Sequence, residues 1–311
     1  MVMTTATFVH PSGKAFPGQL GIYDNVHIDG LARLAKGIKA QNEASISIVQ
    51  LHHGGVKATF ADPKIGPVTA AGADAVVAMT TDQVHEAIAW FVEAAVRAEK
   101  AGWSGVELHG AHGYLLTSFF ATNNNRGDQF GGSFENRVRI IFEILRGIRR
   151  RCKGNFIVGV RLSCERFGLD TSEMVALAQA LCNETDGRVD FIDLSLWDVF
   201  KMPEQAELQY TTLTNHFLNI DRRHVRIGVC GKVIGSESAQ EALNLGADFV
   251  LIGRSAVVHH NMPVLMQKDS AFLRRLPAVD EQLMQNEGVS PKFITYLHKN
   301  FHESLFSPPK L

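Results

Sequence analysis

The sequence has little that would attach it to a membrane or a nucleic acid. No apolar run approaches the roughly 20 residues that a helix needs to span a bilayer. The formal net charge is -1, which gives no electrostatic reason to expect a polyanionic partner. The first nine residues lack both the basic stretch and the sustained apolar stretch of a signal peptide. We therefore expect a cytoplasmic protein that binds neither nucleic acid nor membrane.

Cysteine is also scarce, and its spacing argues against a metal centre. The four cysteines, Cys152, Cys164, Cys182 and Cys230, lie far apart, without the close pairs of a zinc or iron–sulfur site. A zinc site built on His109 and His112 would lack a nearby third ligand. The sequence thus predicts reduced thiols and no metal.

What is present is typical of an α/β protein. Short apolar runs rich in Val, Ile and Phe alternate with helical patterns, which indicates a parallel sheet, in either a (β/α)₈ barrel or a doubly wound fold. No Gly-x-Gly-x-x-Gly turn follows an early strand, which weakens the doubly wound, dinucleotide-binding alternative. We predict one domain over 1–311, with a helical appendage from about 261. The seven strands are expected at about 2–9, 46–51, 105–109, 156–162, 190–195, 226–230 and 247–252.

Local signals mark several helix ends. Thr80 and Gln83 form a capping box, Gly102 is placed to end the same helix, and Ser133 can cap the next. The long connection over 53–80 is predicted to be irregular and functional. Arg126 and Asp128 can tie this long loop. Further helices are expected at about 27–42, 171–184, 211–221, 235–244 and 280–303.

The stretch from Gly105 to Leu116 carries the strongest chemical signal. A short strand ends by presenting His109, His112 and Tyr114 among glycines that permit a tight turn. Two imidazoles can donate hydrogen bonds to one oxygen, and a neighbouring phenol can supply a proton. This stretch is therefore predicted to be an active site. For Tyr114 a packing role alone remains an alternative.

Other candidates stand where strands end, which is where barrels of this type place their functional groups. Gln50 and Arg161 belong to two such strands, and the last two strands run into Gly231-Lys232 and Gly253-Arg254. A glycine followed by a cation on both final strands favours a phosphate site. Structural alternatives remain open: Arg161 and Glu107 can pair inside the barrel, Gln50 can merely satisfy backbone groups, and His52 and His53 can be structural.

Several of these motifs resemble those of one known family. The stretches from Glu107 to Leu116 and from Asn125 to Arg137 are similar to the central motifs of the old yellow enzyme family of FMN-dependent ene-reductases. Gln50-Leu-His-His, Val160-Arg-Leu-Ser and Ile252-Gly-Arg follow the family pattern in the expected order. The resemblance covers the chain from Thr4 to about Pro263.

The resemblance implies a TIM barrel that binds FMN. Gln50 would bond the pyrimidine side of the flavin, Arg161 would lie beside the ring, and Ala6 would lie beneath it. The phosphate would be held by Gly231, Gly253 and Arg254. His109 and His112 would bind the carbonyl oxygen of an electron-poor alkene, and Tyr114 would protonate its α-carbon. NADPH or NADH would be the reductant.

Two departures from the family pattern are visible in the sequence. The family's usual first strand and helix have no counterpart before Thr4, so we expect a (β/α)₈ barrel lacking them. Thr5 stands where the family usually has Glu, and Val56 where many relatives have Arg. A flavin-free, non-catalytic barrel is therefore the alternative to the enzyme. The oligomeric state, a homo-oligomer included, is left open by the sequence.

Overall fold

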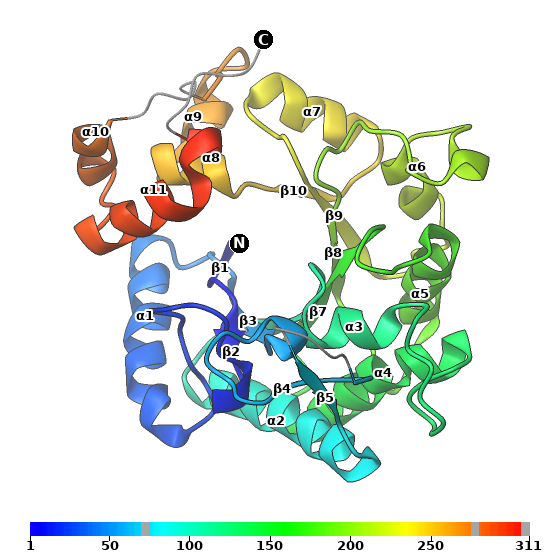
Figure 1. Cartoon of the computed structure of the whole chain (residues 1–311). Coiled ribbons are helices and arrows are strands. Elements are labelled where there is room, and N and C mark those ends of the chain that lie inside the picture. Colours follow the sequence, from blue (N-terminus) through cyan, green and yellow to red (C-terminus); the bar gives the residue numbers. More distant parts are fainter. Residues whose placement is uncertain (70–74, 275–279, 306–311) are drawn as a thin grey trace. The chain divides into compact units, whose positions relative to one another are not determined.

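The computed structural model describes residues 1–69, 75–274 and 280–305 as helices and parallel strands in alternation (Figure 1). The chain divides into two compact units, unit 1 over 1–195 and 202–227, and unit 2 over 196–201 and 228–311. The α/β fold class predicted from the sequence is confirmed. The prediction of a single domain remains a prediction.

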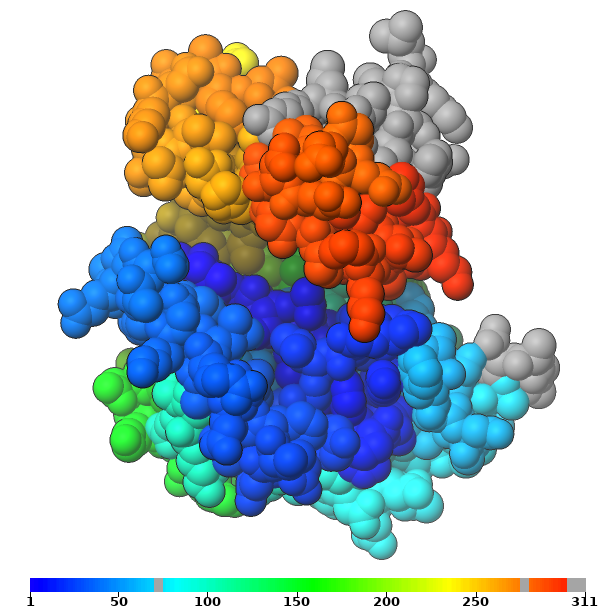
Figure 2. Space-filling model, turned by 90° about the vertical axis from the view of Figure 1, so that its left-hand side faces the viewer, coloured from blue at the N-terminus to red at the C-terminus, as the bar shows by residue number. Residues whose placement is uncertain are grey.

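Unit 1 is built on a parallel sheet whose longer strands are almost entirely buried. Every strand of this sheet after the first is followed by a helix or a short turn of helix, and α2 and α4 lie side by side over the sheet (Figure 1). The strands are β1 (Val2–Met3), β2 (Thr7–Phe8), β3 (Ser47–His52), β6 (Gly105–Gly110), β7 (Ile157–Ser163) and β8 (Phe191–Ser195). The helices are α1 (Ile28–Gln41), α2 (Thr81–Lys100), α3 (Leu115–Phe120), α4 (Phe134–Arg151), α5 (Thr171–Asn183) and α6 (Leu213–Leu218). Helix α1 and the residues before it, in blue, form much of the face shown in Figure 2.

The register of this sheet places the polar side chains of neighbouring strands opposite one another. Strands β1 and β2 both pair with β3, β3 pairs with β6, β6 with β7, and β7 with β8. Gln50 lies opposite Glu107, and His109 lies opposite Arg161, which in turn lies opposite Asp193. Since parallel strands end at the same edge of a sheet, the groups that follow β3, β6, β7 and β8 gather at one edge.

The capping signals of the sequence are confirmed. Thr80 accepts the backbone N–H of Gln83 while the Gln83 side chain bonds back to the cap, and Gly102 follows the helix end with φ of 80°. Ser133 caps α4 by accepting from the backbone N–H of Asn136. The irregular connection expected over 53–80 was wrong in part, because β4 (Lys64–Gly66) and β5 (Val76–Ala78) form a small parallel sheet within it. Residues 70–74 of this connection lie outside the described residues.

Unit 2 contains the last strands and the C-terminal helices. Strand β9 (Arg226–Cys230), which begins in unit 1, pairs in parallel with β10 (Phe249–Leu251). Val258, Met284, Ile294 and Leu297 form an apolar cluster that joins three of the helices. The helix predicted over 280–303 was wrong as a single element, because Gly288 with φ of 82° ends its first part. The helices are α7 (Ser236–Asn244), α8 (Arg254–Val258), α9 (Met262–Lys268), α10 (Glu281–Asn286) and α11 (Pro291–Leu305). Across the described ranges, no helix combines the length and apolar character needed to cross a membrane.

Candidate active site

Four aromatic side chains from the ends of β3 and β6 form one cluster in unit 1. The ring of His109 lies 5.4 Å from that of His52, 5.0 Å from that of His112 and 5.3 Å from that of Tyr114, measured between centroids. His52 meets Tyr114 edge-on at 4.4 Å. The structure therefore brings together the three residues predicted to be catalytic, and adds His52 to them.

The imidazoles of this cluster are uncharged at neutral pH. Burial, with a smaller contribution from His112, lowers the pKa of His52 to about 3. Burial also lowers the pKa of His109 well below its usual value, and burial together with Arg161 and Lys57 lowers that of His112 to about 4. Among the described residues, neither ring nitrogen of His52 nor Nδ1 of His109 has a hydrogen-bond partner. The cluster thus presents neutral ring nitrogens that a ligand can engage.

A serine at the end of β8 fixes the orientation of His112. Ser195 Oγ lies 2.8 Å from His112 Nε2 and accepts a hydrogen bond from Arg161 Nη2 at 3.2 Å. Because a guanidinium only donates, the hydroxyl proton of Ser195 is available to His112 Nε2. The backbone N–H of His112 donates to Ser163 Oγ at 2.9 Å, and its φ is 64°. Serines at the ends of β7 and β8 therefore hold both the backbone and the ring of His112.

Beneath the rings, a buried polar cluster connects β3, β6, β7 and β8. Gln50 Nε2 donates to Glu107 Oε1 at 2.7 Å, and Arg161 Nε lies 3.3 Å from Asp193 Oδ2. Burial and, to a smaller extent, the charge of nearby Asp193 raise the pKa of Glu107 to about 8. Burial also raises the pKa of Asp193. At neutral pH Glu107 therefore keeps its proton, since two carboxylates in a dry site cannot both ionise at low cost.

Lys57 lies beside the ring cluster and contacts it from the connection after β3. Its Nζ donates to the backbone oxygen of His112 at 2.6 Å and lies 4.7 Å from the ring centre of Phe167 and 5.5 Å from that of Tyr114. A Cβ on Gly113, whose φ is 72°, would come within 3.0 Å of both Lys57 and Phe167. The glycine is thus required for this close packing.

His53 belongs to a separate, structural group. Its Nδ1 accepts the backbone N–H of Gly55 at 3.1 Å, so that Nε2 carries the proton and donates to Ser12 Oγ at 3.1 Å. Ser12 in turn bonds His10 Nδ1 at 2.7 Å, and both imidazoles stack on Trp90. Every ring nitrogen of His53 is thus used within the protein.

Acidification should weaken the fold through His53. Burial, with smaller contributions from His52 and His10, lowers its pKa to about 3, whereas the unfolded chain takes up a proton near pH 6.5. This stabilisation is complete above pH 6.5 and is lost as the pH falls toward 3, by about 2 kcal/mol between pH 7 and pH 5. We expect the difference in unfolding free energy between wild type and His53→Gln, measured in urea, to shrink by about that amount at pH 5. An unchanged difference would show that His53 is protonated in the folded protein.

The residues predicted to hold a phosphate lie in unit 2. Gly231 has φ of 149°, and a Cβ there would lie 2.6 Å from the backbone of Trp197, so this glycine allows the loop over 196–201 to pack. Gly253 precedes α8, and a Cβ on this glycine would meet no other atom within 4 Å. Arg254, the next residue, is exposed. Burial and, to a smaller extent, the charge of Arg254 lower the pKa of Arg274. The buried Nε of Arg274 has no hydrogen-bond partner among the described residues. Two neighbouring guanidiniums, one of them unsatisfied, favour an anion beside them.

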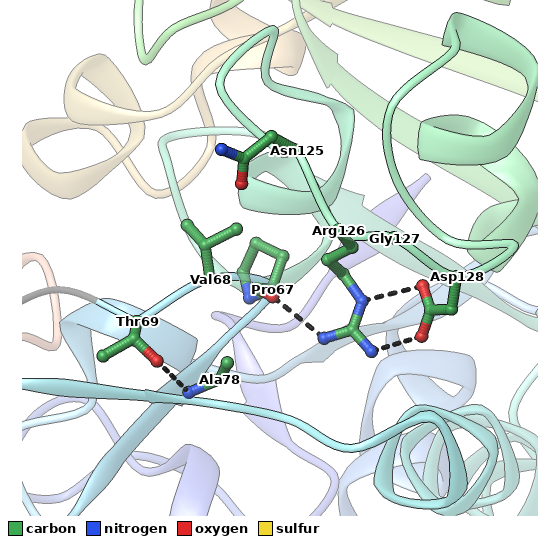
Figure 3. A pocket seen from close by; sticks show the side chains of 8 residues that line it. All are labelled: Pro67, Val68, Thr69, Ala78, Asn125, Arg126, Gly127 and Asp128. Carbon is green, nitrogen blue, oxygen red and sulfur yellow. Dashed lines mark hydrogen bonds and ion pairs between the residues drawn. The ribbon is translucent and has the colours of Figure 1, made fainter.

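A surface pocket of about 490 Å³ lies elsewhere in unit 1, between the ends of the small sheet β4–β5 and the loop after α3 (Figure 3). Arg126 lines this pocket, and its Nε and Nη2 donate to the two carboxylate oxygens of Asp128. Nη1 of Arg126 donates to the backbone oxygens of Pro67 and Met79. The prediction that Arg126 and Asp128 tie the long loop is confirmed. Four N–H groups of Arg126 are thus used to hold the loops that line this pocket.

Removing Arg126 should therefore destabilise the protein strongly. Its side chain is 8% exposed, and Arg126→Ala would remove a donor from two backbone oxygens and the ion-pair partner of the Asp128 carboxylate. We expect a loss of about 3 kcal/mol in unfolding free energy. The matched control is Arg151→Ala, which breaks the exposed Arg151–Glu93 pair and should cost less than about 1 kcal/mol. Equal losses in both variants would contradict the role of Arg126.

The remaining predicted residues take up positions that the sequence only partly anticipated. Ala6 lies between β1 and β2 and is half-buried, and its backbone oxygen accepts from Gln19 Nε2 at 3.0 Å. Sequence reasoning gave no role to Ser163, Ser195, Lys57 or Arg274. Ser163 and Ser195 end their strands, so the rule that found Gln50 and Arg161 could have found them as well.

Comparison with known proteins gives a consistent result. Residues 1–271 match the model of the NADH:flavin oxidoreductase / NADH oxidase family. The chain is 33% identical over 282 residues to the probable NADH-dependent flavin oxidoreductase YqiG of Bacillus subtilis, covering 86% of this chain and 74% of that protein. It is 33% identical over 262 residues to the NADPH dehydrogenase of Bacillus licheniformis, with coverage of 82% and 75%.

Solved structures support the TIM-barrel type of fold. The structure of morphinone reductase in complex with tetrahydroNAD aligns with a TM-score of 0.74 at 23% identity, over 91% of this chain and 80% of that one. A 2-naphthoyl-CoA reductase complex aligns with a TM-score of 0.77 at 23% identity, over 87% of this chain. The match spans 45% of the longer reductase chain. At this level of identity the likeness concerns the fold alone.

Proposed function

The chain belongs to the NADH:flavin oxidoreductase / NADH oxidase family, whose cofactors are FMN and NADPH or NADH, and from this premise we propose that it reduces activated C=C bonds. The substrates are α,β-unsaturated carbonyl compounds and similar electron-poor alkenes. The observation that carries the proposal is the cluster of His109, His112 and Tyr114, in which neutral imidazoles lie next to a phenol.

The residues of the chain fit the expected cofactor. Buried nitrogens of His52 and His109 have no hydrogen-bond partner within the described part of the chain, which indicates a site completed by a polar ligand. Arg161 places a guanidinium among buried groups at the end of β7, where it would favour negative charge on a ligand ring. Gln50 would bond the pyrimidine side of FMN, and Ala6 would lie beneath the ring. Gly231, Gly253 and Arg254, joined by Arg274, would hold the phosphate.

The side chains above the flavin would polarise and protonate the substrate. His109 and His112 would each donate a hydrogen bond to the carbonyl oxygen, which draws electron density toward that oxygen and stabilises the charge that develops there. Tyr114 would give the proton of its Oη to the carbon next to the carbonyl. When bound, FMN carries two electrons from NAD(P)H to the alkene.

The test follows the colour of the purified protein loaded with FMN. Anaerobic NADPH or NADH should bleach the flavin absorption, and an added α,β-unsaturated ketone should restore it with formation of the saturated ketone. Bleaching without restoration by any activated alkene would leave an NAD(P)H:flavin oxidoreductase with another electron acceptor. A folded protein that binds no FMN would support the alternative of a flavin-free, non-catalytic barrel.

The phosphate site makes a separate prediction. Arg274→Leu and Arg254→Leu should each weaken FMN binding about tenfold, because a hydrogen bond to a charged group contributes about 1.5 kcal/mol. Riboflavin lacks the phosphate, so its affinity should be the same in both variants as in the wild type. Dissociation constants from the change in flavin fluorescence measure both ligands. If riboflavin binding weakens equally, the two arginines act on the fold and do not hold the phosphate.

A further inference from the structure

We propose that Glu107 is a positioning residue for FMN, which holds the side-chain amide of Gln50 with its oxygen toward the ligand. The inference rests on the proposed function, because it takes Gln50 as the residue that meets the pyrimidine side of the flavin. In the chemistry proposed above, Glu107 has no direct part. Its contacts nevertheless decide which end of the Gln50 amide is available.

The contact between the two residues is built into the register of the sheet. Gln50 on β3 lies directly opposite Glu107 on β6, and both side chains are buried. Gln50 Nε2 donates to Glu107 Oε1 at 2.7 Å, and the same nitrogen lies 3.7 Å from Met3 Sδ on β1. An amide NH₂ has two hydrogens, and these two acceptors take both of them. The amide oxygen is therefore the end of Gln50 that remains for a ligand.

The opposite orientation of the amide is disfavoured on chemical grounds. Exchanging the nitrogen and oxygen of Gln50 would place the amide oxygen against the thioether sulfur of Met3, which carries no hydrogen to donate. At Glu107, which keeps its proton, the exchange would require that proton on Oε1, the oxygen that now accepts from Gln50 Nε2. Glu107 and Met3 together select one of the two orientations.

This orientation has a defined consequence for recognition. The pyrimidine edge of a flavin presents two carbonyl oxygens with the N3–H group between them. An amide oxygen only accepts, so Gln50 can bond this edge at N3–H and not at either carbonyl. The site should therefore discriminate against a flavin that lacks this hydrogen. N3-methyl-FMN is such a flavin, and it keeps the phosphate.

The experiment measures dissociation constants of FMN and N3-methyl-FMN for the full-length chain stripped of flavin, by fluorescence titration. The wild type should bind FMN at least about tenfold more tightly than N3-methyl-FMN. In Glu107→Leu the amide of Gln50 is released and can turn its NH₂ toward a carbonyl, so the ratio of the two constants should fall at least threefold. Glu107→Gln keeps an acceptor oxygen at the same place and should retain the ratio of the wild type. A purely structural role of Glu107 would weaken both ligands equally.

Further outcomes separate this inference from the proposed function. If the wild type binds no FMN, the proposed function fails. If the wild type binds FMN but Glu107→Leu keeps the full ratio, the positioning role is overturned. The variant Gln50→Leu tests the inference even if Glu107→Leu does not fold. In Gln50→Leu the ratio of the two dissociation constants should fall at least threefold, and an unchanged ratio would also overturn the inference. In the Gln50→Leu background, a second change at Glu107 should leave the ratio where it is.

Discussion

Replacing Tyr114 with Phe should slow alkene reduction between a hundredfold and ten-thousandfold, which is the usual contribution of a positioned general acid. The phenol ring lies 4.4 Å from His52 and 5.3 Å from His109 between centroids, and Phe keeps those ring contacts. The variant loses the Oη proton that we assign to the substrate carbon. Reduction of the flavin by NAD(P)H needs no such proton and should proceed at the rate of the wild type.

Stopped-flow absorbance separates these two half-reactions. Tyr210→Phe is the matched control, because Tyr210 is 76% exposed and belongs to neither the ring cluster nor its supports. Both half-reactions should be unchanged in the control. If Tyr114→Phe reduces the alkene at the rate of the wild type, another group supplies the proton and the role of Tyr114 is packing.

Replacing His109 with Ala should lower alkene reduction by about a hundredfold to a thousandfold, the usual effect of removing one donor from an oxyanion site. His109 is buried at the end of β6, and its Nδ1 has no hydrogen-bond partner among the described residues. The same change should weaken the binding of phenols, whose oxygen we expect at the position of the substrate carbonyl oxygen. A ligand titration of the FMN-loaded protein with 4-hydroxybenzaldehyde measures this affinity.

His85 offers a control for the loss of an imidazole. It lies on α2, and its side chain is 48% exposed beside Glu143. His85→Ala should leave both phenol affinity and alkene reduction unchanged. Equal phenol affinity in the wild type and in His109→Ala would contradict the assignment of His109 as a donor to the carbonyl oxygen.

The fold was predictable where local chemistry decides the structure. Alternating apolar runs fixed the positions of the long buried strands, and capping residues such as Thr80 and Ser133 fixed the starts of α2 and α4. The small sheet β4–β5 was missed because its strands have three residues each and are stabilised by distant contacts such as those of Arg126. The helix expected over 280–303 was wrong because the apolar period continues through Gly288, where the chain turns.

The candidate site was predictable in its residues but not in their contacts. The spacing of His109, His112 and Tyr114 predicted a cluster. In the structure the centroids of the three rings lie within 6.4 Å of one another. No local pattern shows that Ser195, 83 residues after His112, supports that imidazole. The burial of Arg274 beside Arg254 likewise depends on tertiary packing that a single sequence does not encode in any short motif.

The uncharged state of the imidazoles has a consequence for how the site would respond to acidity. The pKa of His52 is about 3 and that of His112 about 4, so these rings keep the same charge from pH 5 to pH 8. Between pH 5 and pH 7, below the pKa of about 8 of Glu107, a change in phenol affinity would therefore come from the ionisation of the phenol and not from these imidazoles. In that interval a series of ring-substituted phenols would report its own acidity, because the imidazoles of the cluster keep a constant charge.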